Sequence, residues 1–119
     1  MGKRARKRDK VSAPTSEYTD ADGNVLELRG SLTPATRREY AALLAGGTGP
    51  AQTREDIWQR AVEFLFERLA VSWTVSGVET ARQKELLMRF RVASVEERTW
   101  IRGVLREHLA EWFPDVEAP

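Results

Sequence analysis

The sequence predicts a mainly α fold, in which an N-terminal β-hairpin and a short helix pack on a three-helix core, preceded by a disordered basic tail. The main observation is a succession of three helix-start signatures, at residues 53–56 (TRED), 80–83 (TARQ) and 94–97 (SVEE). Each places a hydroxyl at an N-cap and a carboxylate or amide three positions later, where both can satisfy backbone N–H groups. The second observation is turn chemistry at residues 20–24 (DADGN), which predicts the hairpin.

The chain of 119 residues has room for one domain and a tail. Residues 1–16 are charged and then contain Ser, Pro and Thr without large apolar side chains, which predicts a disordered basic tail. We expect a single small helical domain over residues 17–114, with the hairpin at 17–30. Residues 115–119 are expected to form a C-terminal tail.

The first elements of the domain are predicted from alternation and from capping residues. Residues 25–29 (VLELR) alternate apolar and polar side chains, as a half-buried strand does, and residues 17–19 are the expected partner strand. Thr33 at an N-cap and Pro34 at the first helical position predict a short helix. That helix should end where a linker, residues 46–52, begins.

The next predicted helix begins after Thr53, and its apolar side chains cover an arc nearly twice as wide as the stripe of about 100° on an ordinary surface helix. Two interpretations remain open. The rest of the fold covers this helix on more than one side, or part of the arc binds a protein partner or a second copy through Trp58, Phe66 and Trp73. Residues 71–76 alternate like a strand, but Trp73 continues the helical row, so we favour a helix to about residue 76.

Two further helices complete the predicted core. One spans about residues 81–91, and the other runs from about 95 to 113, where Pro114 ends it. The last helix has an apolar stripe of Ile101, Val104, Leu105, Leu109 and Trp112.

The residue types needed for catalysis or metal binding are scarce. The chain has no cysteine, which excludes disulfides and thiol chemistry. Its single histidine, His108, has no orienting partner or nucleophile in its sequence neighbourhood, so a structural role is the better interpretation. We therefore predict no catalytic, cofactor-binding or metal-binding residue. An enzyme would need a pocket that joins His108 to a carboxylate.

The charges are divided unevenly along the chain. Residues 1–10 carry a net charge of +5, whereas the other 109 residues hold 13 basic and 17 acidic groups. A flexible basic arm binds phosphate backbones with little sequence discrimination. The arm therefore indicates possible RNA or DNA contact through Lys3, Arg4, Arg6, Lys7 and Arg8. The alternative is a tail that only improves solubility.

A second basic feature is the arginine column, which we define as Arg98, Arg102 and Arg106. These residues repeat at four-residue spacing with no acidic residue three or four positions away, so neighbouring charges repel by about 0.2–0.5 kcal/mol per pair. Glu63 and Glu67 form an acidic pair one helical turn apart and are the expected internal partners. The alternative partner is an external anion, such as nucleic-acid phosphate or an acidic protein.

Residues 54–60 (REDIWQR), 66–71 (FERLAV) and 82–87 (RQKELL) resemble small uncharacterised proteins of high-GC actinobacteria, and the similarity extends from the hairpin to Pro114. This resemblance implies a bacterial, cytoplasmic setting and says nothing about mechanism. Together these observations predict a non-enzymatic interaction or adaptor protein. The alternative is a nucleic-acid-associated accessory protein that uses the basic arm and the arginine column. Neither a cofactor nor a membrane is expected among its partners.

Overall fold

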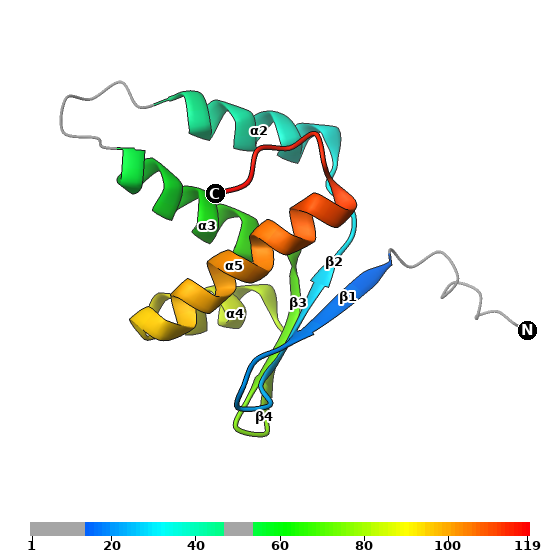
Figure 1. The fold of residues 1–119 in the computed structure, drawn as a ribbon, viewed down its shortest axis with the longest axis vertical. Helices are drawn as coiled ribbons and strands as arrows, with labels where there is room; N and C mark the ends of the chain where they lie inside the picture. Colours follow the sequence, from blue (N-terminus) through cyan, green and yellow to red (C-terminus); the bar gives the residue numbers. More distant parts are fainter. Residues whose placement is uncertain (1–13, 47–53) are drawn as a thin grey trace, which may run out of the picture.

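The computed structural model describes residues 14–46 and 54–119, and within these ranges it contains four helices and a four-stranded antiparallel sheet (Figure 1). Helices hold 56% and strands 19% of these residues, so the fold is mixed α/β and the prediction of a mainly α fold is wrong. The elements follow in the order β1 (Thr15–Thr19), β2 (Val25–Arg29), α2 (Pro34–Ala45), α3 (Arg54–Leu69), β3 (Ala70–Val75), β4 (Val78–Thr80), α4 (Gln83–Arg91) and α5 (Val95–Trp112).

The fold class was misjudged at residues 70–80, which form β3 and β4 instead of extending the helix to residue 76. β3 pairs antiparallel with β2, and Trp73 lies opposite Leu26. Ser76 and Gly77 have φ angles of 51° and 79°, so both central turn residues are left-handed, as a tight hairpin turn requires. The free edge of β2 offers backbone partners to this β-branched segment, and that pairing outweighs its continuity with α3.

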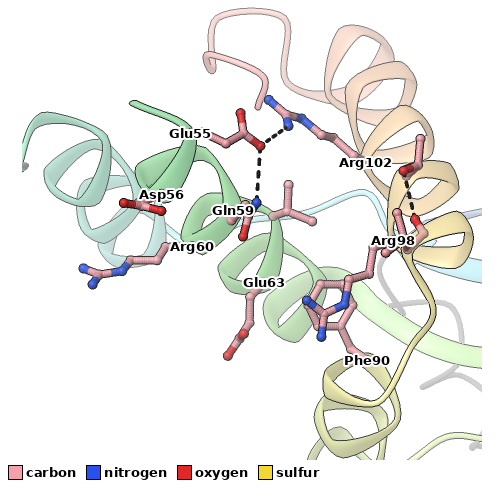
Figure 2. Close-up of a pocket in the computed structure, with 11 residues that line it drawn as sticks. Glu55, Asp56, Gln59, Arg60, Glu63, Phe90, Arg98 and Arg102 are labelled. Atoms are coloured by element: carbon pink, nitrogen blue, oxygen red, sulfur yellow. Dashed lines mark hydrogen bonds and ion pairs between the residues drawn. The ribbon is translucent and has the colours of Figure 1, made fainter. Parts of the chain in front are cut away.

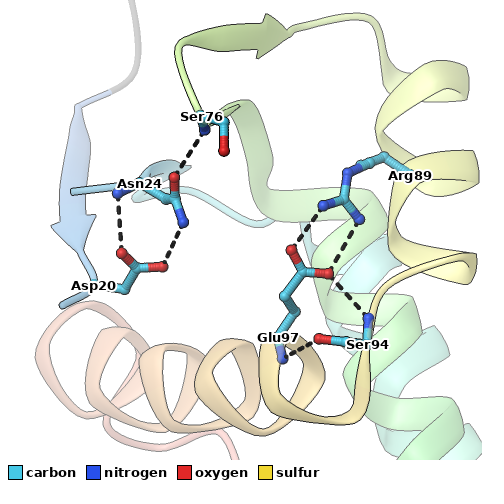
Figure 3. Close-up of polar contacts among 6 residues, drawn as sticks. All are labelled: Asp20, Asn24, Ser76, Arg89, Ser94 and Glu97. Carbon is cyan, nitrogen blue, oxygen red and sulfur yellow. Dashed lines mark hydrogen bonds and ion pairs between the residues drawn. The ribbon is translucent and has the colours of Figure 1, made fainter. Parts of the chain in front are cut away.

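The first hairpin is confirmed, with β1 and β2 paired in register from Thr15 with Arg29 to Thr19 with Val25. Asp20 orders the turn because its Oδ1 accepts hydrogen bonds from the backbone N–H groups of Asp22 and Asn24, at 2.8 and 2.9 Å. The side chain of Asn24 then accepts a bond of 2.9 Å from the N–H of Ser76, which links the two hairpin turns (Figure 3).

Two of the N-caps predicted from the sequence are present in the structure. Thr33 caps α2, and Ser94 caps α5 in a capping box, as predicted. The predicted cap at Thr80 is wrong, because this residue ends β4 and α4 begins after Arg82, whose side chain makes no capping hydrogen bond. The predicted cap at Thr53 lies outside the described residues, as do residues 1–13 of the predicted tail and most of the predicted linker.

The core lies between one face of the sheet and the helices packed against it. Leu26 and Leu28 of β2 are fully buried on this face, and the ring of Phe66 in α3 stacks on Phe90 of α4 at 4.9 Å. The alternate residues of the first hairpin point to the opposite face, where those of β1, such as Glu17, are exposed and Glu27 of β2 is half-buried. The sheet is therefore covered on one side only.

The C-terminal residues 115–119 return toward α2 and contact the domain (Figure 1). The hydroxyl of Tyr40 donates to the backbone carbonyl of Glu117 at 2.6 Å, and Arg106 donates to the carbonyl of Pro119 at 2.8 Å. Pro119 itself is buried. The segment expected as a tail thus joins α2 to α5.

Candidate functional site

A groove of about 570 Å³ lies between α3 and α5, and we call it the α3–α5 groove (Figure 2). Helical spacing brings its lining residues to one side of each helix. On α5 these are Val95, Arg98, Thr99 and Arg102, and on α3 they include Glu55, Gln59, Val62 and Glu63. Phe90 from the end of α4 also lines the groove.

The groove combines an apolar base with charged walls. Val62 and Phe90 are 6% and 3% exposed, so they belong to the base, whereas Val95 is 80% exposed at the start of α5. A salt bridge of 3.2 Å joins Glu55 of α3 to Arg102 of α5. Such a surface can bind apolar and charged groups of a partner together. Protein interfaces are built in the same way, with an apolar core and a polar rim.

The arginine column does not pair with Glu63 and Glu67, so that expectation is wrong. Glu63 accepts instead from Arg91 at 2.7 Å, because the end of α4 lies beside α3 and reaches this carboxylate. Arg102 pairs with Glu55, and Arg106 donates to the carbonyl of Pro119. Of these two arginines, Arg102 binds a carboxylate and Arg106 binds a backbone oxygen of the C-terminal segment.

Arg98, the first residue of the column, is oriented by groups from the end of α4. Its Nη2 donates to the backbone carbonyl of Arg91 at 2.8 Å, and its guanidinium lies 5.2 Å from the ring centroid of Phe90. Within the described ranges, no carboxylate forms an ion pair with Arg98. The sequence could not single out this arginine, since the groups that orient it come from α4.

The three aromatic residues predicted as partner anchors lie in two different environments. Phe66 is fully buried and Trp73 is 2% exposed, so neither can contact a partner in this fold, and this part of the prediction is corrected. Their rings meet edge to face at 5.8 Å. Trp58 is half-buried and lines a smaller cavity with Leu44 and Ile57. The wide apolar arc arises because the sheet and the helices both cover α3.

His108 is buried and joins the first hairpin to α5. Its Nε2 lies 2.8 Å from the carbonyl oxygen of Arg29, which can only accept, so Nε2 carries the proton. Nδ1 therefore accepts from the hydroxyl of Tyr18, also at 2.8 Å. Burial lowers the pKa of His108 and raises the pKa of Tyr18. Sequence reasoning missed Tyr18 because the two residues are 90 positions apart.

The remaining predictions concern metals, membranes and the basic arm. In the part of the chain that the structure describes, no three His, Asp or Glu side chains gather in a way that could hold a metal ion. No helix in those ranges is long and apolar enough to cross a membrane. The arm residues, Lys3, Arg4, Arg6, Lys7 and Arg8, lie outside the described residues.

Comparison with known proteins assigns no family, because the sequence matches no family model and neither a curated protein nor a solved structure matches it. The resemblance to actinobacterial proteins therefore stays a prediction.

Proposed function

We propose that this protein is a non-enzymatic interaction protein and that the α3–α5 groove receives a segment of a protein partner. The observation that supports this function is the groove's combination of a buried apolar base with charged walls on two helices. Protein interfaces use the same combination, with apolar contacts at the centre and polar contacts at the rim. Because helices supply both walls, the surface is held in place before a partner binds.

The side chains of the groove are poorly suited to covalent catalysis. Among the described residues that line the groove, Thr99 is the only one with a hydroxyl, and its Oγ1 donates to the backbone carbonyl of Val95 at 2.9 Å. A hydroxyl nucleophile needs an adjacent base that removes its proton, and His108 is not among the lining residues. These features favour binding over reaction at the groove.

The experiment places a photo-crosslinking amino acid at Thr99 in one variant and at Arg38, on the exposed surface of α2, in a control. Each variant is irradiated in living cells of the source organism, and the captured protein is then purified. Its affinity for the wild-type chain is measured by calorimetry.

Val95→Asp then tests whether this partner uses the groove. The new carboxylate lies at the first position of α5, where the helix dipole favours negative charge, so the fold should be retained. We expect affinity to fall at least about tenfold, because an exposed apolar contact is replaced by a charge. Equal crosslinking from both positions, or unchanged affinity in this variant, contradicts the proposed function.

Nucleic-acid contact remains the alternative function, and it now rests mainly on the basic arm. The internal contacts of Arg102 and Arg106 leave less of the arginine column for phosphate. This alternative expects RNA or duplex DNA binding that weakens steeply with salt and disappears when residues 1–13 are removed. Fluorescence anisotropy at low and physiological salt measures both effects. The cytoplasmic location and a possible homodimer likewise remain proposals, the first resting on the actinobacterial resemblance.

A further inference from the structure

One arginine that lines the α3–α5 groove, Arg98, has no ion-pair partner among the described residues. Among the described residues, three carboxylates and three arginines line the groove. Glu55 pairs with Arg102, and Glu63 pairs with Arg91, which is not a lining residue. Asp56 and Arg60 are each engaged with another group. That pairing leaves Arg98 without an ion-pair partner among the described residues.

The guanidinium of Arg98 is already oriented. One N–H group donates to the carbonyl of Arg91, and the planar group lies over the ring of Phe90. Phe90 is only 3% exposed, so its ring is a fixed support. A guanidinium has five N–H donors and binds a carboxylate through two parallel hydrogen bonds. Because the support limits the rotation of Arg98, less conformational entropy is lost on binding.

An apolar side chain stands one helical turn from this arginine. Val95 is 80% exposed and lies three positions before Arg98 on α5, so both face the same side of the helix. The exposed Val92, which caps the end of α4, precedes it in the connecting loop. A ligand with a carboxylate next to an apolar side chain would therefore match two neighbouring features.

We propose that the groove recognises an acidic peptide segment of a protein partner, with Arg98 binding its carboxylate and Val95 contacting an adjacent apolar side chain. This inference rests on the proposed function and specifies the chemistry of the partner. A single carboxylate would supply the ion-pair partner that Arg98 lacks among the described residues. A nucleic-acid strand matches less well, because it carries a charge about every 3.4 Å and would bring further phosphates toward Glu55 and Glu63.

The test is an NMR titration of the ¹⁵N-labelled full chain with the capped peptide acetyl-ALELA-amide. A second titration uses acetyl-ALQLA-amide, which has the same shape without the charge. We expect the acidic peptide to shift amide resonances at residues 95–99. The neutral peptide should bind about tenfold more weakly, which corresponds to the lower end of the free energy that a charge-assisted hydrogen bond contributes. Arg98→Gln should remove this preference, whereas Arg38→Gln, which changes an exposed arginine on α2, should keep it.

Three outcomes would overturn the inference. The first is equal affinity for the two peptides, or no shift at residues 95–99 at millimolar peptide. The second is a partner, captured by the crosslinker at Thr99, that binds Arg98→Gln as tightly as wild type; this result leaves the proposed function intact. The third is a short RNA that shifts the same resonances and loses this effect in Arg98→Gln, which would assign the arginine to phosphate.

Discussion

The start of α5 provides the most direct test of how local chemistry stabilises this fold (Figure 3). Ser94 Oγ accepts from the N–H of Glu97 at 3.0 Å, and Glu97 Oε1 accepts from the N–H of Ser94 at 2.9 Å. Arg89 of α4 binds the same carboxylate with both Nη groups, at 3.3 and 2.7 Å. The carboxylate of Glu97 therefore caps the start of α5 and also binds α4 to α5.

Ser94→Ala removes the acceptor for the N–H of Glu97 and should destabilise the fold by about 1 kcal/mol, within the range of about 0.5–2 for such caps. For a domain of this size, that loss lowers Tm by about 4–8 °C. Glu97→Gln keeps a side-chain oxygen for the cap but loses the ion pair. Since the side chains of Arg89 and Glu97 are 29% and 28% exposed, water screens the pair and the cost should be about 0.5–1 kcal/mol.

The assay is urea unfolding followed by tryptophan fluorescence, with Glu96→Gln as the matched control because this neighbouring exposed carboxylate makes no contact with Arg89. The hydrogen bond from Arg89 is the main cause that lowers the pKa of Glu97. Ionised Glu97 therefore stabilises the fold above its ordinary pKa of 4.5, and this contribution is lost as the pH falls through the lower folded value. Equal stability losses in Ser94→Ala and Glu96→Gln would refute the reasoning.

The other predictions concern the buried histidine, the second hairpin turn and the core. Burial lowers the pKa of His108 below 6.5, so neutral His108 stabilises the fold above that pH, and the urea midpoint should fall as the pH decreases from 7 to 5.5. His108→Gln should make the urea midpoint less dependent on pH. An unchanged pH dependence in this variant would assign the effect to other groups. Gly77→Ala should destabilise the fold by about 1 kcal/mol or more, because the φ angle of Gly77 is 79°, whereas Gly77→Asn should destabilise it less. Equal Tm values for these two variants would contradict the turn assignment. Phe66→Ala should cost about 3–5 kcal/mol as a core truncation, and Val78→Ala, at a side chain 68% exposed, should be close to neutral in the same unfolding assay.

The sequence by itself determined the features that close within a few residues. Thr33 and Ser94 cap their helices through hydrogen bonds to residues three positions away. Asp20 likewise orders its turn through bonds to residues two and four positions away. Because both partners of each bond lie in one short segment, the residue types at that spacing are sufficient to predict the contact.

The tertiary structure decided the features whose partners are distant in the chain. The segment containing Trp73 became a strand because β2 offered it an edge, and the wide apolar arc of α3 became core because helices and sheet cover it on different sides. The partners of the arginine column followed the same rule. Arg102 binds a carboxylate 47 positions away, and Arg98 is oriented by a carbonyl and a ring on α4. Periodicity shows which side chains share a helix face, but only the packing of helices selects the groups that they meet.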